Sequence, residues 1–363
     1  QNGAMDRREF LVGGLQAGIA LTALNKIDLA EKKEKFDYDR SKKYYVWTGL
    51  NKKATADELK ARYTSLKSHG ITGVFLGGGI DDREFDAVKE AGLELHSWMW
   101  TTNRGDKWIM DNHPDWYMVS RTGKSCFDHP PYVDYYRWVS PLIPGVQDYL
   151  KDKVDELASH KAVDGVHLDY VRYPDVILPR ALWAKYGLDQ TTELPDYDFD
   201  YGKHARDAFK AETGRDPMEI KDPANDQEWL HFRYDSVTLL VIQLAEVAWK
   251  RKKKITAAVF PTPRLARYIC RQDWGNWPLD GVCPMLYSSF YEEKVEWIGD
   301  RMTENIQATL LPVYAGLYMP DLGKVTDFTK ALSTAMDHGA SGVSLFGGVD
   351  EDHWKAFEAY LAR

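Results

Sequence analysis

The stretch VDGVHLDYVRYP, residues 163–174, decides the fold, because its polar and apolar side chains alternate. Successive side chains of an extended strand point to opposite faces, so His167 and Asp169 share one face and the apolar residues beside them share the other. A parallel barrel suits this pattern, since helices cover the apolar outer face and polar residues gather inside, near the C-terminal rim.

The same kind of short apolar run recurs along the chain, separated by longer amphipathic stretches, and this alternation predicts parallel strands with crossover helices. The second, fourth, sixth and eighth runs each carry a Gly-Val step, as expected where alternate strands feed alternate interior layers. We therefore predict a TIM (β/α)8 barrel whose strands cover residues 44–50, 71–78, 93–100, 163–171, 255–260, 279–287, 308–318 and 340–348.

Two β/α connections are long, the third from Thr101 to about Ile143 and the fourth from Tyr173 to about Gln227. Both leave the C-terminal ends of strands, the face that carries active sites in TIM barrels. Long connections at this face predict a substrate cleft. Residues 41–363 are thus expected to form a single TIM-barrel catalytic domain.

The N-terminal segment, residues 1–40, is different in kind. QNGA at positions 1–4 is typical of a tag remnant, MDRREFL contains the pair Arg7-Arg8, and the apolar run VGGLQAGIALTAL follows. A charged stretch before a short apolar run predicts an export signal, here resembling the twin-arginine type, and hence a periplasmic or secreted protein. The alternative is an ordinary amphipathic helix. The run is too short for a stable membrane span.

Composition narrows the class of partner. A net charge of −8 argues against a nucleic-acid surface, which normally presents a basic face. The 13 Trp and 21 Tyr supply flat rings of the kind that stack on sugars. The three cysteines lie far apart, so neither a zinc knuckle nor a disulfide framework is expected. We expect a carbohydrate partner and no metal or cofactor.

Asp169 is the main catalytic candidate. Burying a carboxylate inside a barrel is costly unless the group is paired or used. Arg172 lies close enough along the chain to be its partner, and a neighbouring guanidinium would keep Asp169 ionised, as a nucleophile or transition-state stabiliser requires. The alternative is an ion pair that only closes the strand end.

Three segments together carry a family resemblance: DGVHLDYVRYP, WVSPLIPGVQDYLKDKVDELASH and QDWGNWPLDGVCPMLY. They resemble the glycosyl-hydrolase-like ten family, bacterial TIM barrels classed with glycoside hydrolases. The resemblance implies action on glycosides, with Asp169 at the position of the family's strand-four acid. Chitinase-type barrels carry DGxDxDxE on this strand, but His167, Val171 and Arg172 do not fit that pattern, so a chitinase mechanism is rejected.

Glycoside hydrolysis generally needs a second carboxyl group, about 5 Å away for retention and roughly 6.5 to 9.5 Å for inversion. Asp350, just beyond the eighth strand, is the first choice, followed by Asp82 and Asp175. Each of these could instead cap a helix. Asp273 is interpreted as structural because it is expected within the short fifth helix, heading away from the mouth.

Further candidates lie at strand ends, where rings and hydrogen-bond donors can hold sugar hydroxyls. Arg104 would also suit a substrate carboxylate. The predicted substrate-binding residues are Trp47, His96, Trp98, Trp100, Asn103, Arg104, His167, Tyr170, Arg172, Tyr287 and Tyr318.

The leading hypothesis is a glycoside hydrolase that cleaves an oligo- or polysaccharide, with Asp169 and Asp350 as its carboxylates. The first alternative is a carbohydrate-binding barrel that does not hydrolyse. The second is a metal-dependent amidohydrolase, which needs clustered histidines; the first strand has no HxH and the ten histidines are scattered.

Overall fold

The computed structural model describes residues 38–363, which contain eight parallel strands in the order β6-β5-β4-β3-β2-β1-β8-β7. The predicted TIM barrel is confirmed. The tag remnant and the export signal fall outside the described residues. The strands are β1 (Lys43–Gly49), β2 (Gly73–Gly77), β3 (Glu94–Trp100), β4 (Gly165–Asp169), β5 (Lys254–Val259), β6 (Gly281–Pro284), β7 (Tyr314–Tyr318) and β8 (Gly342–Phe346).

The barrel closes between β6 and β7. These two strands meet through parallel bridges that pair Val282 with Val313 and Met285 with Gly316. Closure brings the C-terminal ends of all eight strands around one mouth, so residues far apart in sequence become neighbours there.

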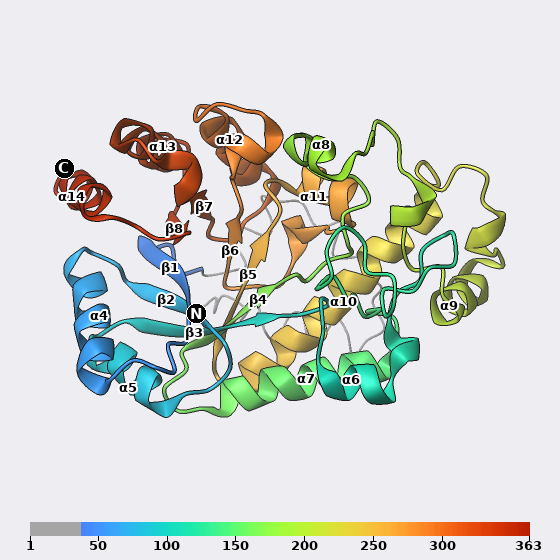
Figure 1. The fold of residues 1–363 in the computed structure, drawn as a ribbon, viewed down its shortest axis with the longest axis horizontal. Coiled ribbons are helices and arrows are strands. Elements are labelled where there is room, and N and C mark those ends of the chain that lie inside the picture. The colour runs from blue at the N-terminus through green and yellow to red at the C-terminus, as the bar shows by residue number, and fades with distance from the viewer. Residues whose placement is uncertain (1–37) are drawn as a thin grey trace, which may run out of the picture.

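Helices surround the strands (Figure 1), and α7 and α10 pack against each other along one side. The connections around α9 extend away from the barrel on the side opposite α14. The helices are α4 (Ala56–Ser68), α5 (Asp82–Glu90), α6 (Lys107–Asn112), α7 (Pro144–Ser159), α8 (Trp183–Tyr186), α9 (Lys203–Thr213), α10 (Gln227–Lys250), α11 (Pro263–Cys270), α12 (Trp297–Ala308), α13 (Val325–Asp337) and α14 (Glu351–Leu361). Short 3-10 turns include η5 (Trp274–Asn276), η6 (Ser288–Tyr291) and η7 (Met319–Leu322).

Several helices start where a polar side chain caps the first turn. Thr55 and Glu58 form a reciprocal capping box at α4, and Asp81 accepts from the amides of Arg83 and Glu84 at α5. Such caps satisfy amides that have no partner within the helix. They therefore fix where each β/α connection ends.

The predicted alternation along β4 is confirmed. Val166 and Leu168 are buried in the layer between strands and helices. His167 points inside the barrel, where its ring stacks on Phe75 with 3.7 Å between centroids. Asp169, two residues further on the same face, reaches the mouth of the barrel.

The Gly-Val steps of the even strands have a packing reason. A Cβ atom at Gly73 would lie 2.7 Å from the Tyr45 ring, and one at Gly281 would lie 2.6 Å from the Tyr314 ring. Large side chains from β1 and β7 thus fill the space that these glycines of β2 and β6 leave open. This arrangement agrees with the expected alternation of interior layers.

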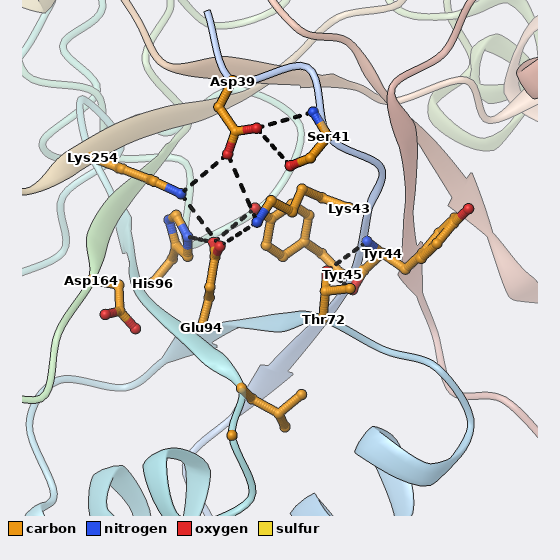
Figure 2. Close-up of polar contacts among 12 residues, drawn as sticks. Asp39, Ser41, Lys43, Tyr44, Tyr45, Thr72, Glu94, His96, Asp164 and Lys254 are labelled. Atoms are coloured by element: carbon orange, nitrogen blue, oxygen red, sulfur yellow. Dashed lines mark hydrogen bonds and ion pairs between the residues drawn. The ribbon is translucent and has the colours of Figure 1, made fainter.

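The N-terminal end of the barrel is closed by charged groups around Glu94 (Figure 2). The Glu94 carboxylate accepts from Lys43 Nζ at 2.6 Å, from Tyr45 OH at 3.1 Å and from Lys254 Nζ at 3.3 Å. His96 Nε2 lies 3.1 Å from the same carboxylate. His96, predicted to bind substrate at the rim, is therefore buried in the lower barrel. It shares a face with Trp98, but only the later residues of β3 reach the mouth.

Candidate active site

A cavity of about 280 Å³ opens at the C-terminal ends of the strands, where an active site is expected in a TIM barrel. Most of its lining is aromatic or aliphatic, with a few charged groups, as is usual for ligand sites. It is lined by Trp47, Trp98, Trp100, Tyr136, Asp169, Tyr170, Arg172, Asp175, Leu178, Pro179, Leu182, Ala258, Phe260, Met285, Tyr287, Phe290, Tyr291 and Phe346.

Asp169, the last residue of β4, holds two hydrogen bonds at this cavity. Trp98 Nε1 donates to its Oδ2 at 3.1 Å, and the amide of Tyr170 donates to its Oδ1 at 2.7 Å. Burial raises the pKa of Asp169 above its usual value, and the two hydrogen bonds and the charge of Arg172 offset this only in part. The charge of Arg172 acts on Asp169 in the predicted direction, but it is outweighed by burial and does not set the pKa of this group. A raised pKa suits a carboxyl group that donates a proton.

Arg172 pairs with a different acid. Its Nη1 donates to Asp175 Oδ2 at 3.2 Å and to the carbonyl of Tyr173 at 2.8 Å. The guanidinium also lies 4.7 Å from the Trp138 ring centroid and 4.6 Å from that of Phe260. Burial alone would lower the pKa of Arg172, but Asp175 and nearby groups raise it. Arg172 thus remains cationic and presents a fixed positive charge to Asp175.

The backbone turns sharply directly after Asp169. Tyr170 has φ 49°, a left-handed conformation that is uncommon for a residue other than glycine. Thr102 holds this turn: its amide donates to the Tyr170 carbonyl at 3.1 Å and its hydroxyl to the Arg172 carbonyl at 2.6 Å. As a result both Tyr170 and Arg172 line the cavity, although the strand alternation ends at Asp169.

Trp98 owes its position to a glycine on the neighbouring strand. A Cβ atom at Gly77 would lie 2.9 Å from Cε3 of the Trp98 indole. The absence of a side chain lets the indole lie close against β2. From there its nitrogen reaches Asp169.

Aromatic rings from β7, from β8 and from Tyr287, which follows β6, form the opposite side of the mouth. The Tyr287 and Phe346 rings are nearly parallel at 6.4 Å, and the Tyr318 ring lies 5.1 Å from that of Tyr287. Burial, followed by the charge of Asp169, raises the pKa of Tyr287 well above its usual value, so its phenol stays protonated. Tyr287 lines the cavity as predicted, whereas Tyr318 lies behind it as a packing partner.

Three other predicted binding residues form hydrogen bonds or ion pairs within the protein. Asn103 is buried and accepts from the Arg137 amide at 2.9 Å. Arg104 donates to both carboxylate oxygens of Asp106, at 2.5 and 2.7 Å. None of Asn103, Arg104 and His167 lines the cavity with Asp169.

His167 lies within the barrel interior. Trp47 Nε1 donates to its Nε2 at 2.9 Å, and its Nδ1 lies 2.8 Å from Thr256 Oγ1. Burial lowers the pKa of His167 well below its usual value, so the ring is neutral. It supports Trp47, which does line the cavity.

The acids considered as the second carboxyl group differ in whether they line the cavity. Asp350 caps α14 by accepting from the His353 amide at 3.0 Å, is 68% exposed and does not line the cavity, which corrects the first choice. Asp82 is 81% exposed and lies 2.8 Å from His160 Nε2. Asp273 pairs with Arg267 at 2.8 Å, consistent with a structural role. Asp175, by contrast, lines the same cavity as Asp169.

The residues that sequence reasoning missed are mostly apolar cavity walls contributed by connections. Leu178, Pro179 and Leu182 follow β4, and Phe290 and Tyr291 lie in η6 after β6. The only signal in the sequence was the aromatic SSFY run directly after PMLY.

Within residues 38–363, no group of three or more His, Cys, Asp or Glu is arranged to hold a metal ion. Cys126, Cys270 and Cys283 are free and buried. None of the described helices is long and apolar enough to cross a membrane.

A closed barrel with a carboxyl-bearing aromatic cavity at its C-terminal mouth defines the class of TIM-barrel proteins to which many glycosidases belong. The chain belongs to the glycosyl hydrolase-like 10 family, whose model matches residues 80–331. This confirms the resemblance found in the sequence.

Individual proteins agree with this assignment. The chain is similar to glycosyl hydrolase YngK of Bacillus subtilis (strain 168), with 27% identity over 196 residues. That match covers 48% of this chain and 36% of YngK, so the chain spans well under half of the relative.

Solved structures with the same fold include the PgaB (BpsB) glycoside hydrolase domain from Bordetella bronchiseptica, with TM-score 0.63 and 11% identity over 87% of this chain and 95% of that one. Another is the catalytic domain of beta-amylase from Paenibacillus polymyxa, with TM-score 0.59 and 13% identity over 88% of this chain and 98% of that one. At these identities the structures establish the fold.

Proposed function

We propose that the protein hydrolyses O-glycosidic bonds in an oligo- or polysaccharide, with Asp169 as the proton donor and Asp175 as the second carboxyl group. The observation that carries the proposal is that both acids line one cavity while their surroundings differ. Glycosidases divide the acid role and the base or nucleophile role between two carboxyl groups that flank the scissile bond.

Asp169 protonates the leaving oxygen. Burial raises the pKa of Asp169, which favours its protonated form, and the indole of Trp98 fixes the direction of the carboxyl group. This role differs from the nucleophile expected from the sequence.

Asp175 is the second carboxyl group of the proposal. The guanidinium of Arg172 donates a hydrogen bond to its Oδ2 at 3.2 Å and so holds the carboxyl group at the cavity wall. From there Asp175 would serve either as the base that activates water or as the nucleophile.

A carbohydrate is the proposed substrate because aromatic faces dominate the cavity. Trp100 is 40% exposed at the mouth, and Trp47, Trp98 and Tyr287 line the inside. Such rings stack on the apolar faces of sugars while their polar edges hydrogen-bond hydroxyls. The non-hydrolysing alternative was motivated by a missing second acid, and Asp175, which lines the same cavity as Asp169, is the candidate for that acid.

The experiment is a screen of the purified protein against a broad glycan panel, followed by Asp169→Asn and Asp175→Asn variants on the responding glycan. Each variant should lose at least about a hundredfold in kcat/KM. Asp350→Asn is the matched control and should retain full activity. Full activity of the Asp175→Asn variant would remove that residue from the mechanism.

We also propose that the protein acts outside the cytoplasm. The proposal rests on the Arg7-Arg8 pair before an apolar run. Cell fractionation of a tagged protein should find the wild type exported and an Arg7→Lys/Arg8→Lys variant retained; equal export of both would contradict a twin-arginine route.

A further inference from the structure

A second hollow, of about 1060 Å³, lies beside the cavity that holds Asp169. Trp98 and Trp100 line both spaces and so form a wall common to them. The remaining lining comes from the ends of β1 and β2 with the connections that follow them, from β3 and the connection after it, and from α7. A ligand that crosses the edge of Trp100 would therefore occupy both spaces at once.

Glycine backbone forms part of the wall of this second hollow. It includes Gly49 and the run Gly77–Gly79. A Cβ atom at Gly79 would meet no atom within 4 Å, so the space above it is open. At the rim, Ile80 is 41% exposed and Trp100 is 40% exposed. Open backbone at Gly79 beside the exposed indole of Trp100 suits an extended ligand such as a sugar chain.

The charges around the second hollow are unbalanced. Arg104 is neutralised by Asp106 and Lys153 by Glu156. Lys52 and Lys53 are exposed and line the hollow, and no acidic side chain among residues 38–363 pairs with either of them. Lys52 and Lys53 are adjacent in sequence and line the same hollow, so their charges act together there. They would attract an anionic ligand into this groove.

We propose that the substrate is an oligosaccharide carrying negative charges and that it crosses Trp100. One sugar sits beside Asp169, and further acidic sugars lie over Gly77–Gly79, where Lys52 and Lys53 contact their carboxylate or sulfate groups. The placement of the reacting sugar rests on the proposed function. Binding in the second hollow does not require hydrolysis, so it can be tested separately.

The experiment measures dissociation constants by calorimetry in the full-length Asp169→Asn variant, which keeps any bound chain intact. The probes are a galacturonic acid tetrasaccharide, its fully methyl-esterified form and a sulfated heparin-derived tetrasaccharide. At least one charged probe should bind about tenfold more tightly than the neutral ester. Comparison of the two charged probes shows whether carboxylate or sulfate is preferred.

Charge reversal locates the site. Lys52→Glu/Lys53→Glu should weaken binding of the charged probe by about tenfold or more and leave the ester unaffected. The matched control is Lys60→Glu/Lys250→Glu, which makes the same change in net charge on exposed lysines outside the hollow. This control should bind like the parent. Trp100→Ala should weaken every tetrasaccharide because it removes the shared wall.

Three results would overturn the inference: equal affinity for charged and neutral probes, absence of binding by all of them, or equal losses in the test and control pairs. A loss caused by Lys221→Glu instead would place the anion in another hollow, lined by Lys221, Arg267 and Arg271 beside α11. Lysine-dependent binding without hydrolysis of any glycan would leave the inference intact and refute the proposed function. Hydrolysis of a neutral glycan that is unaffected by Lys52→Glu/Lys53→Glu would support the proposed function and refute the inference about a charged substrate.

Discussion

Replacing Trp98 by phenylalanine tests how the environment of Asp169 is set. The change keeps an aromatic ring but removes the indole N–H that donates to Asp169 Oδ2 at 3.1 Å. A hydrogen bond to a carboxylate stabilises the charged form, so its loss should raise the pKa of Asp169 further.

The magnitude follows from the strength of such a bond. Hydrogen bonds to charged groups are worth about 1.5 to 3 kcal/mol. Asp169 is partly accessible through the cavity, so the lower end of this range applies. One pKa unit corresponds to about 1.4 kcal/mol, and the expected rise is therefore about one unit.

The assay is the pH dependence of kcat/KM on the responding glycan. A proton donor works in its protonated form, so activity falls as pH rises through its pKa. The alkaline limb of the Trp98→Phe profile should move up by about one pH unit. Trp100→Phe is the control, because no hydrogen bond from its indole nitrogen is found within residues 38–363; its limb should stay in place. An unmoved limb, or one displaced to lower pH, in Trp98→Phe would refute the reasoning.

Three further predictions concern packing, stability and the corrected acid. In Gly77→Ala the new Cβ would lie 2.9 Å from Cε3 of Trp98 and displace the indole. We expect kcat/KM to fall about tenfold, which corresponds to about 1.4 kcal/mol in the activation free energy. Unchanged kinetics would show that the indole adjusts freely. Glu94→Gln should lower the free energy of unfolding, measured with urea at pH 7, by about 3 kcal/mol. Burial alone would raise the pKa of Glu94, but the contact with His96 and the neighbouring lysines hold it well below its usual value. The stabilisation by ionised Glu94 is therefore present above a pH of about 4.3 and is lost as pH falls. A difference in unfolding free energy between variant and wild type that widens in acid would contradict this prediction. Asp350→Ala removes a helix cap and should lower stability by about 1 kcal/mol with kcat/KM unchanged, whereas a catalytic loss would restore its first assignment.

The fold was predictable because its signals are local. Alternation along each strand and the Gly-Val steps at the even strands located all eight strands to within a few residues. The seventh was the least accurate, since the predicted run 308–318 begins well before β7 at Tyr314. Pro312 lies in the extra part, and a proline donates no backbone hydrogen bond to a neighbouring strand.

The site was predictable where it depends on strand ends. Asp169, Trp98, Trp100 and Tyr287 follow from the period of two and from the C-terminal mouth of the barrel. His96 shares that period, but the sequence does not show how deep along the strand the cavity begins.

The partners of these residues were not predictable from spacing. Arg172 was assigned to Asp169, but the left-handed turn at Tyr170 ends the alternation, and the guanidinium pairs with Asp175. Asp350 could equally have been a cap or a catalyst, because both roles place an aspartate directly after a strand. Only the three-dimensional structure distinguishes the two roles, because it shows that Asp350 does not line the cavity.

The central claim is that Asp169 donates a proton to the leaving group, and its most direct test compares two substrates of the same sugar in the Asp169→Asn variant. The natural glycan has a poor leaving group that needs protonation, whereas a dinitrophenyl glycoside has one that departs without it. We predict that kcat/KM on the glycan falls by about 10² to 10⁴ while hydrolysis of the dinitrophenyl glycoside is largely retained. Equal losses on both substrates would contradict the claim and return Asp169 to the role of nucleophile.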